Sequence, residues 1–206
     1  TTTPRGRNAG NEGFPIKVCE MLASLDAPYY LERTALGDPK HNNKTRKAVR
    51  KALQMGANSG IHVVDDGLAG SDAPATAEVL AAVLKDRGFD LVVFGSESTD
   101  ARMSVVPAMV AARLGVAPMT FANKVDIDSG AVKIQRQTDY GYDEVEGALP
   151  AVVSVVEKIN EPRFPSFKGI MAAKKKPIEA VSIADAGVSA DAVGHGAART
   201  AVVDFA

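Results

Sequence analysis

Hydrophobic positions follow two different periods along residues 31–115. Three short runs are candidate β-strands, and the third contains LVVF, a nearly continuous apolar stretch as expected at the centre of a parallel sheet. After each run, apolar residues recur at intervals of three and four, which predicts an amphipathic helix. The strands are expected at 31–36, 61–64 and 90–94, and the helices at about 42–55, 71–87 and 102–114. This alternation predicts a doubly wound α/β fold with a mostly parallel sheet.

Capping residues mark the ends of these helices. Asn42 or Asn43 is expected to cap the first helix and Ser71 or Asp72 the second, because a short polar side chain accepts a hydrogen bond from the first free backbone N–H groups. A glycine follows each helix, where a left-handed terminating residue is favoured. These glycines are Gly56, Gly88 and Gly115.

The pattern changes after residue 115. Residues 120–126 and 132–138 flank the turn Asp128-Ser129-Gly130, which predicts an added β-hairpin. The β-branched run LPAVVSVV at 149–156 predicts another buried strand. From residue 181 to 206 the sequence is rich in Ala, Gly and Ser with weak periodicity, and we expect an extended C-terminal arm there.

The segment 161–180 is unsuited to a core. Pro162, Pro165 and Pro177 interrupt any long helix or central strand. Phe164 and Phe167 flank Pro165, where a proline-stiffened loop would display them, and the lysines at 174–176 follow. An apolar projection backed by positive charge is typical of a surface that docks to another protein. The alternative is a surface loop whose phenylalanines fold back into the body.

The turn at residues 95–108, GSESTDARMSVVPA, lies between an apolar strand and a predicted helix. In open α/β sheets such turns place free N–H groups and the positive end of a helix beside a ligand, which favours phosphate. Hydroxyl groups of Ser96, Ser98, Thr99 and Ser104 add short donors. The alternative is that the turn is polar only to cap the helix. Neither G-x-G-x-x-G nor a P-loop motif is present.

Composition and charge exclude several classes. Hydrophobic residues make up 46% of 206 residues and aromatic residues only 5%, which fits one α/β domain with appendages. A net charge of −1 argues against general nucleic-acid binding. The single cysteine, Cys19, suits a reducing compartment. No apolar run approaches the ~20 residues of a membrane span, and the opening TTTPRGRNAG lacks a signal-peptide core. We expect a soluble, cytoplasmic protein.

Candidate catalytic and metal-binding residues are scattered. His41, His62 and His195 form no H-x-x-x-H pair, which argues against zinc. No Ser–His–acid set has a supporting motif such as G-x-S-x-G. We therefore expect no metal and no self-contained active site, which fits a carrier or binding protein.

Several motifs resemble the β subunit of electron transfer flavoprotein. GSESTD followed by VVPAMVAARLG, the stretch KALQMGAN and the run LPAVVSVVEKINEPRFPSFKGIMAAKKKP all match that family, and the similarity extends from about residue 31 to 193. The resemblance implies a Rossmann-like, adenine nucleotide-binding domain at 31–160, a partner-recognition segment at 161–180 and the arm at 181–206. It also implies cytoplasmic localisation in a bacterium, or the mitochondrial matrix in a eukaryote.

The resemblance further implies an electron carrier without covalent catalysis of its own. Such a subunit binds AMP structurally, or in some members a second FAD that splits electron pairs. It forms a heterodimer with an α subunit that holds most of the FAD. The heterodimer accepts electrons from acyl-CoA or related dehydrogenases in fatty acid oxidation, and passes them to a quinone reductase or another acceptor.

Site residues carry over position by position. Phe167 would be the anchor that enters an acyl-CoA dehydrogenase. The residues of the nucleotide site would be Leu36, Gly95, Glu97, Ser98, Thr99, Asp100, Arg102, Met103, Ser104, Val105, Val106 and Ala108. Those of the partner surface would be Phe164, Phe167, Ile170, Met171, Lys174, Lys175 and Lys176.

The chain departs from the family in three places. The run 101–104, ARMS, stands where relatives often have glycines, so backbone approach to phosphate is less assured, and Arg102 could instead supply a charge. Gln137 stands where some members have glutamate. Residues 1–30 lack the family's opening strand and helix and resemble its C-terminal tail instead. We expect a permuted, rearranged or incompletely traced chain; the alternative is an unrelated disordered N-terminus.

Two other functions share parts of this pattern. An adenine-nucleotide-binding regulatory protein of the universal-stress type would share the fold and the turn at 95–108 without needing the 161–180 segment. An ATP-cleaving enzyme on the same scaffold usually carries a Gly-rich S-G-G-x-D-S turn, which this chain lacks.

Overall fold

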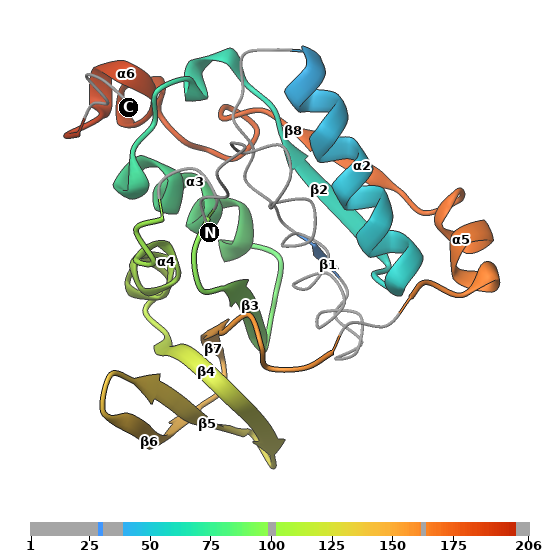
Figure 1. Ribbon diagram of the computed structural model, residues 1–206. Helices are drawn as coiled ribbons and strands as arrows, with labels where there is room; N and C mark the ends of the chain where they lie inside the picture. The colour runs from blue at the N-terminus through green and yellow to red at the C-terminus, as the bar shows by residue number, and fades with distance from the viewer. Residues whose placement is uncertain (1–28, 31–38, 99–101, 162–163, 201–206) are drawn as a thin grey trace, which may run out of the picture. The chain divides into compact units, whose positions relative to one another are not determined.

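A computed structural model describes residues 29–30, 39–98, 102–161 and 164–200, with side chains from residue 46 onward (Figure 1). The described residues fall into two compact units. Unit 1 lies within Thr1–Asp66 and Asn160–Ser182, and unit 2 lies within Gly67–Ile159 and Ile183–Ala206. The expected strand at 31–36 lies outside the described residues.

Unit 1 is a small parallel sheet with a helix on it. The strands β1 (Tyr29–Tyr30), β2 (Ser59–Val63) and β8 (Ile178–Val181) pair in the order β1-β2-β8. The helix α2 (Pro39–Met55) packs on β2, and the short helix α5 (Phe167–Ala173) packs against α2 (Figure 1). Val49, Leu53 and Ile61 form part of the buried interior.

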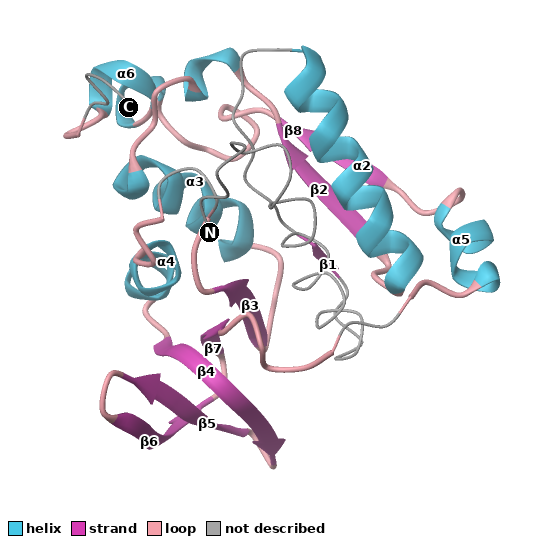
Figure 2. Ribbon diagram, in the orientation of Figure 1, coloured by secondary structure: helices cyan, strands magenta, loops and turns pink. Residues whose placement is uncertain are grey.

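Unit 2 combines helices α3, α4 and α6 with a mixed sheet (Figure 2). Its five strands follow the order β3-β7-β4-β5-β6, with parallel β3–β7 and β4–β7 pairs and antiparallel β4–β5 and β5–β6 pairs. Helix α4 packs on β4 and β7, and α3 packs on α4. The elements are α3 (Ala73–Lys85), β3 (Leu91–Gly95), α4 (Val106–Leu114), β4 (Ala117–Asp128), β5 (Ala131–Thr138), β6 (Gly141–Ala148), β7 (Ala151–Val155) and α6 (Gly194–Ala197), with 3-10 helices η1 (Asp66–Leu68) and η2 (Ala190–Ala192).

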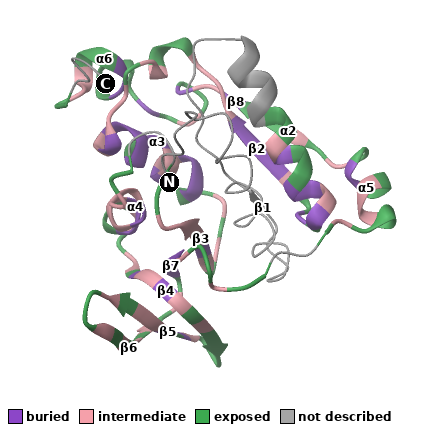
Figure 3. Ribbon diagram, in the orientation of Figure 1, coloured by how far each residue is buried: buried purple, intermediate pink, exposed green. Residues whose placement is uncertain are grey.

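Strand β7 is the centre of the unit 2 core. All five of its residues are buried, as the β-branched sequence predicts (Figure 3). Ser154 is fully buried, and its hydroxyl accepts a hydrogen bond of 2.9 Å from the backbone N–H of Phe121. Phe121 has φ 58° and lies where the β4–β7 register shifts between Met119 and Ala122. A buried serine therefore satisfies the N–H group that the bulge removes from the ladder.

Helix α2 begins earlier than the sequence predicts. Asn42 and Asn43 lie inside the helix, which starts at Pro39. Proline is well tolerated in a first turn, because its missing N–H would have had no intrahelical partner there. The helix ends at Met55, and Gly56 follows with φ 135°, a backbone conformation open mainly to glycine but outside the left-handed helical region.

The start of α3 and the end of α4 agree with their local sequences, whereas α3 ends at Lys85 with Asp86 as its C-cap, before the expected Gly88. Asp72 is the N-cap of α3, and its carboxylate accepts a hydrogen bond of 3.0 Å from the N–H of Ala75. Gly115 ends α4 in the left-handed conformation, with φ 69° and ψ 30°. Helix α4 begins at Val106 instead of residue 102, because Arg102 and Ser104 have φ values of 50° and 56° that are incompatible with a right-handed helix.

The hairpin and the β7 strand confirm the sequence analysis, but the sheet arrangement differs. Strand β3 was expected at the centre of a parallel sheet, yet it is the edge strand of the described five-stranded sheet. Strands β2 and β3 belong to separate sheets, because β3 pairs with β7 and β2 pairs with β8. The observed class is α/β with mixed parallel and antiparallel pairing.

Residues 183–200 are not an extended arm. They include η2 and α6, and Ile183, Val188 and Val193 are buried. The N–H of Gly194 donates a 2.8 Å hydrogen bond to the hydroxyl of Ser71, and the N–H of Arg199 donates a 2.8 Å bond to the carboxylate of Asp72. Weak helical periodicity hid this packing, because the segment is held by short turns and side chain–backbone bonds.

Candidate functional site

The turn that follows β3 is the first candidate site. Gly95 is the last residue of the strand, and Glu97 and Ser98 are exposed beyond it. The hydroxyl of Ser104 lies 3.3 Å from Glu97 Oε2 and donates a hydrogen bond to that carboxylate. This bond brings together two of the predicted nucleotide-site residues from the two sides of the turn.

The N-terminus of α4 has no side-chain cap. Val105 occupies the N-cap position and makes no side-chain cap hydrogen bond, and Ser104 is engaged with Glu97. The first N–H groups of an α-helix have no intrahelical partner and carry partial positive charge. No hydroxyl among the described residues of the turn caps α4, which weakens the alternative that these residues are polar only for capping.

The remaining predicted nucleotide-site residues are distributed around this helix start. Arg102 and Met103 are exposed, and Val105, Val106 and Ala108 are half-buried. The positive φ values of Arg102 and Ser104 mark a backbone that bends sharply without glycine. Leu36, Thr99 and Asp100 lie outside the described residues.

Helix α5 is the second candidate site and presents three adjacent stripes. Its N-cap is Ser166, whose hydroxyl accepts a 3.1 Å hydrogen bond from the N–H of Gly169. The stripe Gly169–Ala173 packs against α2: Ala173 is buried, and a Cβ at position 169 would overlap the backbone oxygen of Gln54. The sequence predicts a loop here; Pro165 and Pro177 instead bracket a seven-residue helix.

The outer stripe of α5 is apolar and exposed (Figure 3). Phe167 is 80% exposed and Met171, one turn later, is 47% exposed. Phe164, just before the helix, is 92% exposed. Within unit 1 the phenyl rings therefore do not fold back into the body, contrary to the alternative interpretation of this segment.

Lys176 differs from its two neighbours. Its ammonium group donates hydrogen bonds to the backbone oxygens of Leu53, Gly56 and Ala57, at 3.0, 3.3 and 2.6 Å. These carbonyls terminate α2, where the helix dipole is negative. All three donors of the ammonium are used inside unit 1. The lysine cluster is thus not one docking patch: Lys174 and Lys175 are exposed, whereas Lys176 holds α2 to the segment before β8.

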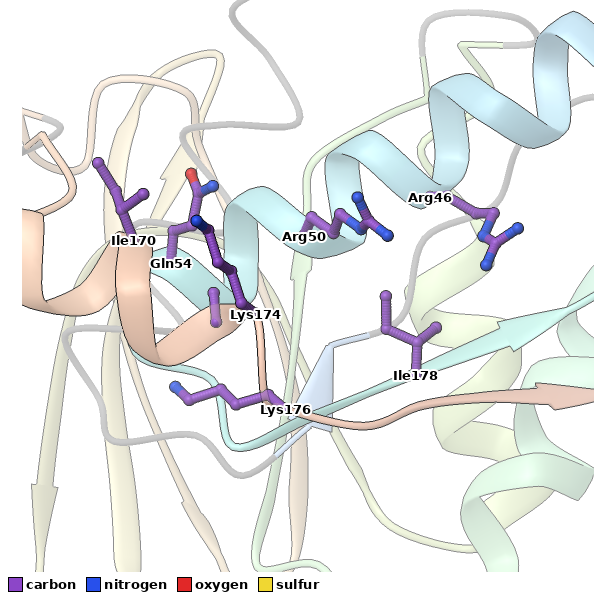
Figure 4. A pocket seen from close by; sticks show the side chains of 8 residues that line it. Arg46, Arg50, Gln54, Ile170, Lys174, Lys176 and Ile178 are labelled. Atoms are coloured by element: carbon purple, nitrogen blue, oxygen red, sulfur yellow. The ribbon is translucent and has the colours of Figure 1, made fainter.

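The third stripe of α5 faces a hollow between α2, α5 and the start of β8 (Figure 4). Ile170 of α5 and its C-cap residue Lys174 contribute to the lining, and the hollow has a volume of about 440 Å³. We call it the α2–α5 hollow. Its lining consists of Arg46, Arg50, Gln54, Ile170, Ala173, Lys174, Lys176 and Ile178. Sequence analysis missed Arg46, Arg50 and Gln54, because basic residues at helical spacing are usually only a solvated face.

His62 is a buried polar residue on the face of β2 that packs against α2. Gly60, two residues earlier, lies against Val49 of α2, and side chains two apart on a strand share a face. His62 Nε2 has no hydrogen-bond partner in the described part of the chain. Burial, and then the positive charge of Arg46, lower the pKa of His62 below its usual 6.5. The ring is therefore neutral at neutral pH.

Neither a metal-binding cluster nor a membrane-spanning helix occurs among the described residues. No group of three or more His, Cys, Asp or Glu side chains is placed to hold a metal ion there. In the same part of the chain, no helix is long and apolar enough to cross a membrane.

These features define an α/β chain with an uncapped strand-to-helix turn and an exposed aromatic surface element. The model of the electron transfer flavoprotein domain matches residues 36–186. This chain therefore belongs to the electron transfer flavoprotein family.

Curated relatives agree with this assignment. The electron transfer flavoprotein subunit beta of Mycobacterium tuberculosis (strain H37Rv) is 48% identical over 161 residues, 78% of this chain and 60% of that protein. The subunit beta of Mycobacterium leprae is 49% identical over 152 residues, 73% of this chain and 57% of that protein. That of Syntrophomonas wolfei is 40% identical over 145 residues, 70% and 57% of the two chains. The chain thus spans 57–60% of the length of these relatives.

Proposed function

We propose that this chain acts as the small, β-type subunit of an electron transfer flavoprotein. It would pair with an α-type subunit that carries FAD, accept electrons from an acyl-CoA or related dehydrogenase, and pass them to a quinone reductase or another acceptor. Its role would be positional, without covalent chemistry of its own.

The observation that carries this proposal is the outer stripe of α5. A family member that exposes Phe164, Phe167 and Met171 on one short helix and its lead-in has an apolar surface suited to a protein partner. Phe167 would be the anchor, because it is a large ring at a helix start that Ser166 fixes by capping.

The turn after β3 would hold AMP. In this proposal the turn is part of a Rossmann-like nucleotide fold, and the free N–H groups at the start of α4 face the phosphate. Ser98 and Ser104 would donate hydroxyl hydrogen bonds, and Arg102 would supply positive charge in place of close backbone approach. Ser104 would exchange its bond to Glu97 for one to the ligand.

Co-expression with an α-type subunit tests the proposal directly. We expect a one-to-one complex by size exclusion with light scattering, a flavin absorbance band, and release of about one AMP per complex on acid extraction. A chain that stays monomeric beside that subunit would contradict the proposal. ATP that is bound and hydrolysed would favour an ATP-cleaving enzyme, and nucleotide binding without any flavin partner would favour a universal-stress-type regulator.

A further inference from the structure

The α2–α5 hollow has a one-signed lining. Arg46, Arg50 and Lys174 supply its positive charge, and no carboxylate of the described residues lines it. None of these three side chains takes part in an ion pair or hydrogen bond with the described residues. Lys176 is already satisfied by the carbonyls at the end of α2.

Placing these cations together is unfavourable, and no ion pair among the described residues offsets that cost. Arg46 and Arg50 are four positions apart on α2, so their like charges face each other across one helical turn. Gly169 lets α5 approach the backbone of Gln54, and this approach brings Lys174 to the same hollow. A ligand that carries negative charge would neutralise all three groups.

The exposure of the hollow favours a macromolecule over a small molecule. Arg46, Arg50 and Lys174 are exposed, whereas pockets for small ligands enclose most of the ligand surface. The stripe Ile170–Lys174 lies directly beside the stripe Phe167–Met171 on α5. A partner surface that covers both stripes would reach the hollow as well, and it would meet apolar Ile170 and Ile178 beside the cations.

We propose that the α2–α5 hollow binds a carboxylate-rich segment of the same protein partner that receives Phe167. Arg46 and Arg50 would pair with Asp or Glu side chains, because guanidinium groups match carboxylates in a two-point geometry. Lys174 would add a point charge from the opposite side. This inference rests on the proposed function, and it adds a charged subsite to the apolar anchor.

A pair of charge-reversed double variants tests it. Arg46→Glu/Arg50→Glu alters the hollow, and Lys47→Glu/Lys51→Glu makes the same change in charge at the same spacing on α2, at exposed positions outside the lining. Each variant is assembled with its flavin-carrying subunit, and its binding to an immobilised acyl-CoA dehydrogenase is measured at low and high salt. We expect the first variant to bind about ten-fold or more weakly, and the second less than about three-fold more weakly.

The outcomes separate this inference from the proposed function. Equal loss in both variants would show general electrostatic steering and would overturn the subsite. No loss in either would also overturn it while leaving the carrier function intact, provided that Phe167→Ala still weakens binding. Unchanged flavin content and circular dichroism of both double variants exclude a folding defect.

Anion binding to the hollow can also be measured without a dehydrogenase, which tests the inference even if no dehydrogenase binds. Hexaglutamate peptide and inorganic phosphate are titrated separately into the isotope-labelled chain, and the side-chain Nε resonances of arginine are followed. We expect saturable shifts of Arg46 and Arg50 with the peptide at concentrations where phosphate has little effect. Shifts of equal size with phosphate would reveal a small-anion site, and no shifts with either would show that the hollow takes no anion. Both results would overturn the inference.

Discussion

The ammonium group of Lys176 lies at the C-terminal end of α2, where three backbone carbonyls converge on it. The three carbonyls belong to Leu53, in the last turn of the helix, and to Gly56 and Ala57, which follow its end. A lysine at this place stabilises the helix end through charge and hydrogen bonding together. The same contacts fix the position of the backbone just before Pro177, where the chain enters β8.

Replacement of Lys176 by methionine should therefore lower the stability of unit 1. We expect Lys176→Met to cost about 2–3 kcal/mol in the free energy of unfolding, as for buried hydrogen bonds to a charged group. Lys175→Met is the matched control at an exposed position, and should stay within about 0.5 kcal/mol of the wild type. Urea denaturation followed by circular dichroism measures both. Equal costs would show that the contacts of Lys176 contribute nothing special.

His62 predicts a dependence of stability on pH. Because burial and the charge of Arg46 lower its pKa in the folded state, protonation favours the unfolded chain. The contribution of His62 is fully present above the unfolded pKa of about 6.5, and it is lost as the pH falls through the lower folded pKa.

Replacement of His62 by leucine should flatten that dependence. The free energy of unfolding in urea is measured at pH 7.5 and at pH 5.0, one value on each side of the unfolded pKa of about 6.5. Between these two pH values, His62→Leu should lose less stability than the wild type. Arg46→Gln should reduce the loss partly, because it removes one of the two causes of the shift. An identical loss in the wild type and in His62→Leu would show that other groups determine the pH dependence.

At the scale of elements, the residues before α3 and the segment around α6 hold each other in place. Gly194 approaches the backbone oxygen of Gly67, and the ring of His195 lies against Gly70. Asp72 serves both parts, since one carboxylate oxygen caps α3 and the other accepts from Arg199. Burial raises the pKa of Asp72, but the backbone hydrogen bonds that its carboxylate accepts together lower the pKa by more, so the net shift is downward.

Glycine substitutions distinguish this packing from backbone strain. Gly70 and Gly88 both have positive φ, 79° and 60°, but a Cβ at Gly70 would overlap the His195 ring, whereas one at Gly88 meets nothing within 4 Å. We expect Gly88→Ala to cost about 1 kcal/mol, from strain alone, and Gly70→Ala about 2–4 kcal/mol. Thermal or urea denaturation of unit 2 compares them. When His195 is also replaced by alanine, Gly70→Ala should destabilise the protein less than it does in the wild type. If the two substitutions are instead additive, Gly70 and the His195 ring are not in contact.

Element ends could be predicted from the sequence where their causes are local. The carboxylate of Asp72, the left-handed Gly115 and the turn at Ser129-Gly130 each act within a few residues. Sheet membership could not be predicted, because apolar strands of similar composition are distinguished only by distant partners, such as β7 between β3 and β4. The lining of the α2–α5 hollow also depends on distant partners, because it joins Arg46, Arg50 and Gln54 of α2 to residues of the segment 170–178.

At the scale of the whole molecule, each unit carries one candidate surface. Unit 2 holds the turn after β3, and unit 1 holds α5 with the α2–α5 hollow. The sequence and its resemblance to a family anticipated both segments, the first by its place between a strand and a helix and the second by its prolines and phenylalanines. In the second surface, a single side chain, Phe167, distinguishes a contribution to partner binding from a contribution to stability.

The ring of Phe167 should contribute to partner binding and hardly to folding. At 80% exposure it buries little surface within the chain, whereas an anchor in a partner pocket commonly contributes about 2 kcal/mol or more. Phe167→Ala should therefore weaken electron transfer with the dehydrogenase roughly thirty-fold at subsaturating partner, since about 1.4 kcal/mol is a factor of ten. Stopped-flow reduction of the flavin in the assembled complex measures the rate.

Tyr140 provides the control, because it is an aromatic side chain that is 84% exposed and belongs to unit 2, whereas α5 belongs to unit 1. Tyr140→Ala should leave the transfer rate within about three-fold of the wild type, and both variants should keep the wild-type melting temperature, as exposed substitutions usually do. If Phe167→Ala instead unfolds the protein while transfer per folded molecule is unchanged, the ring packs inward and α5 is not the docking element. If both variants slow transfer equally, loss of any exposed aromatic surface suffices, and the specific role of Phe167 fails.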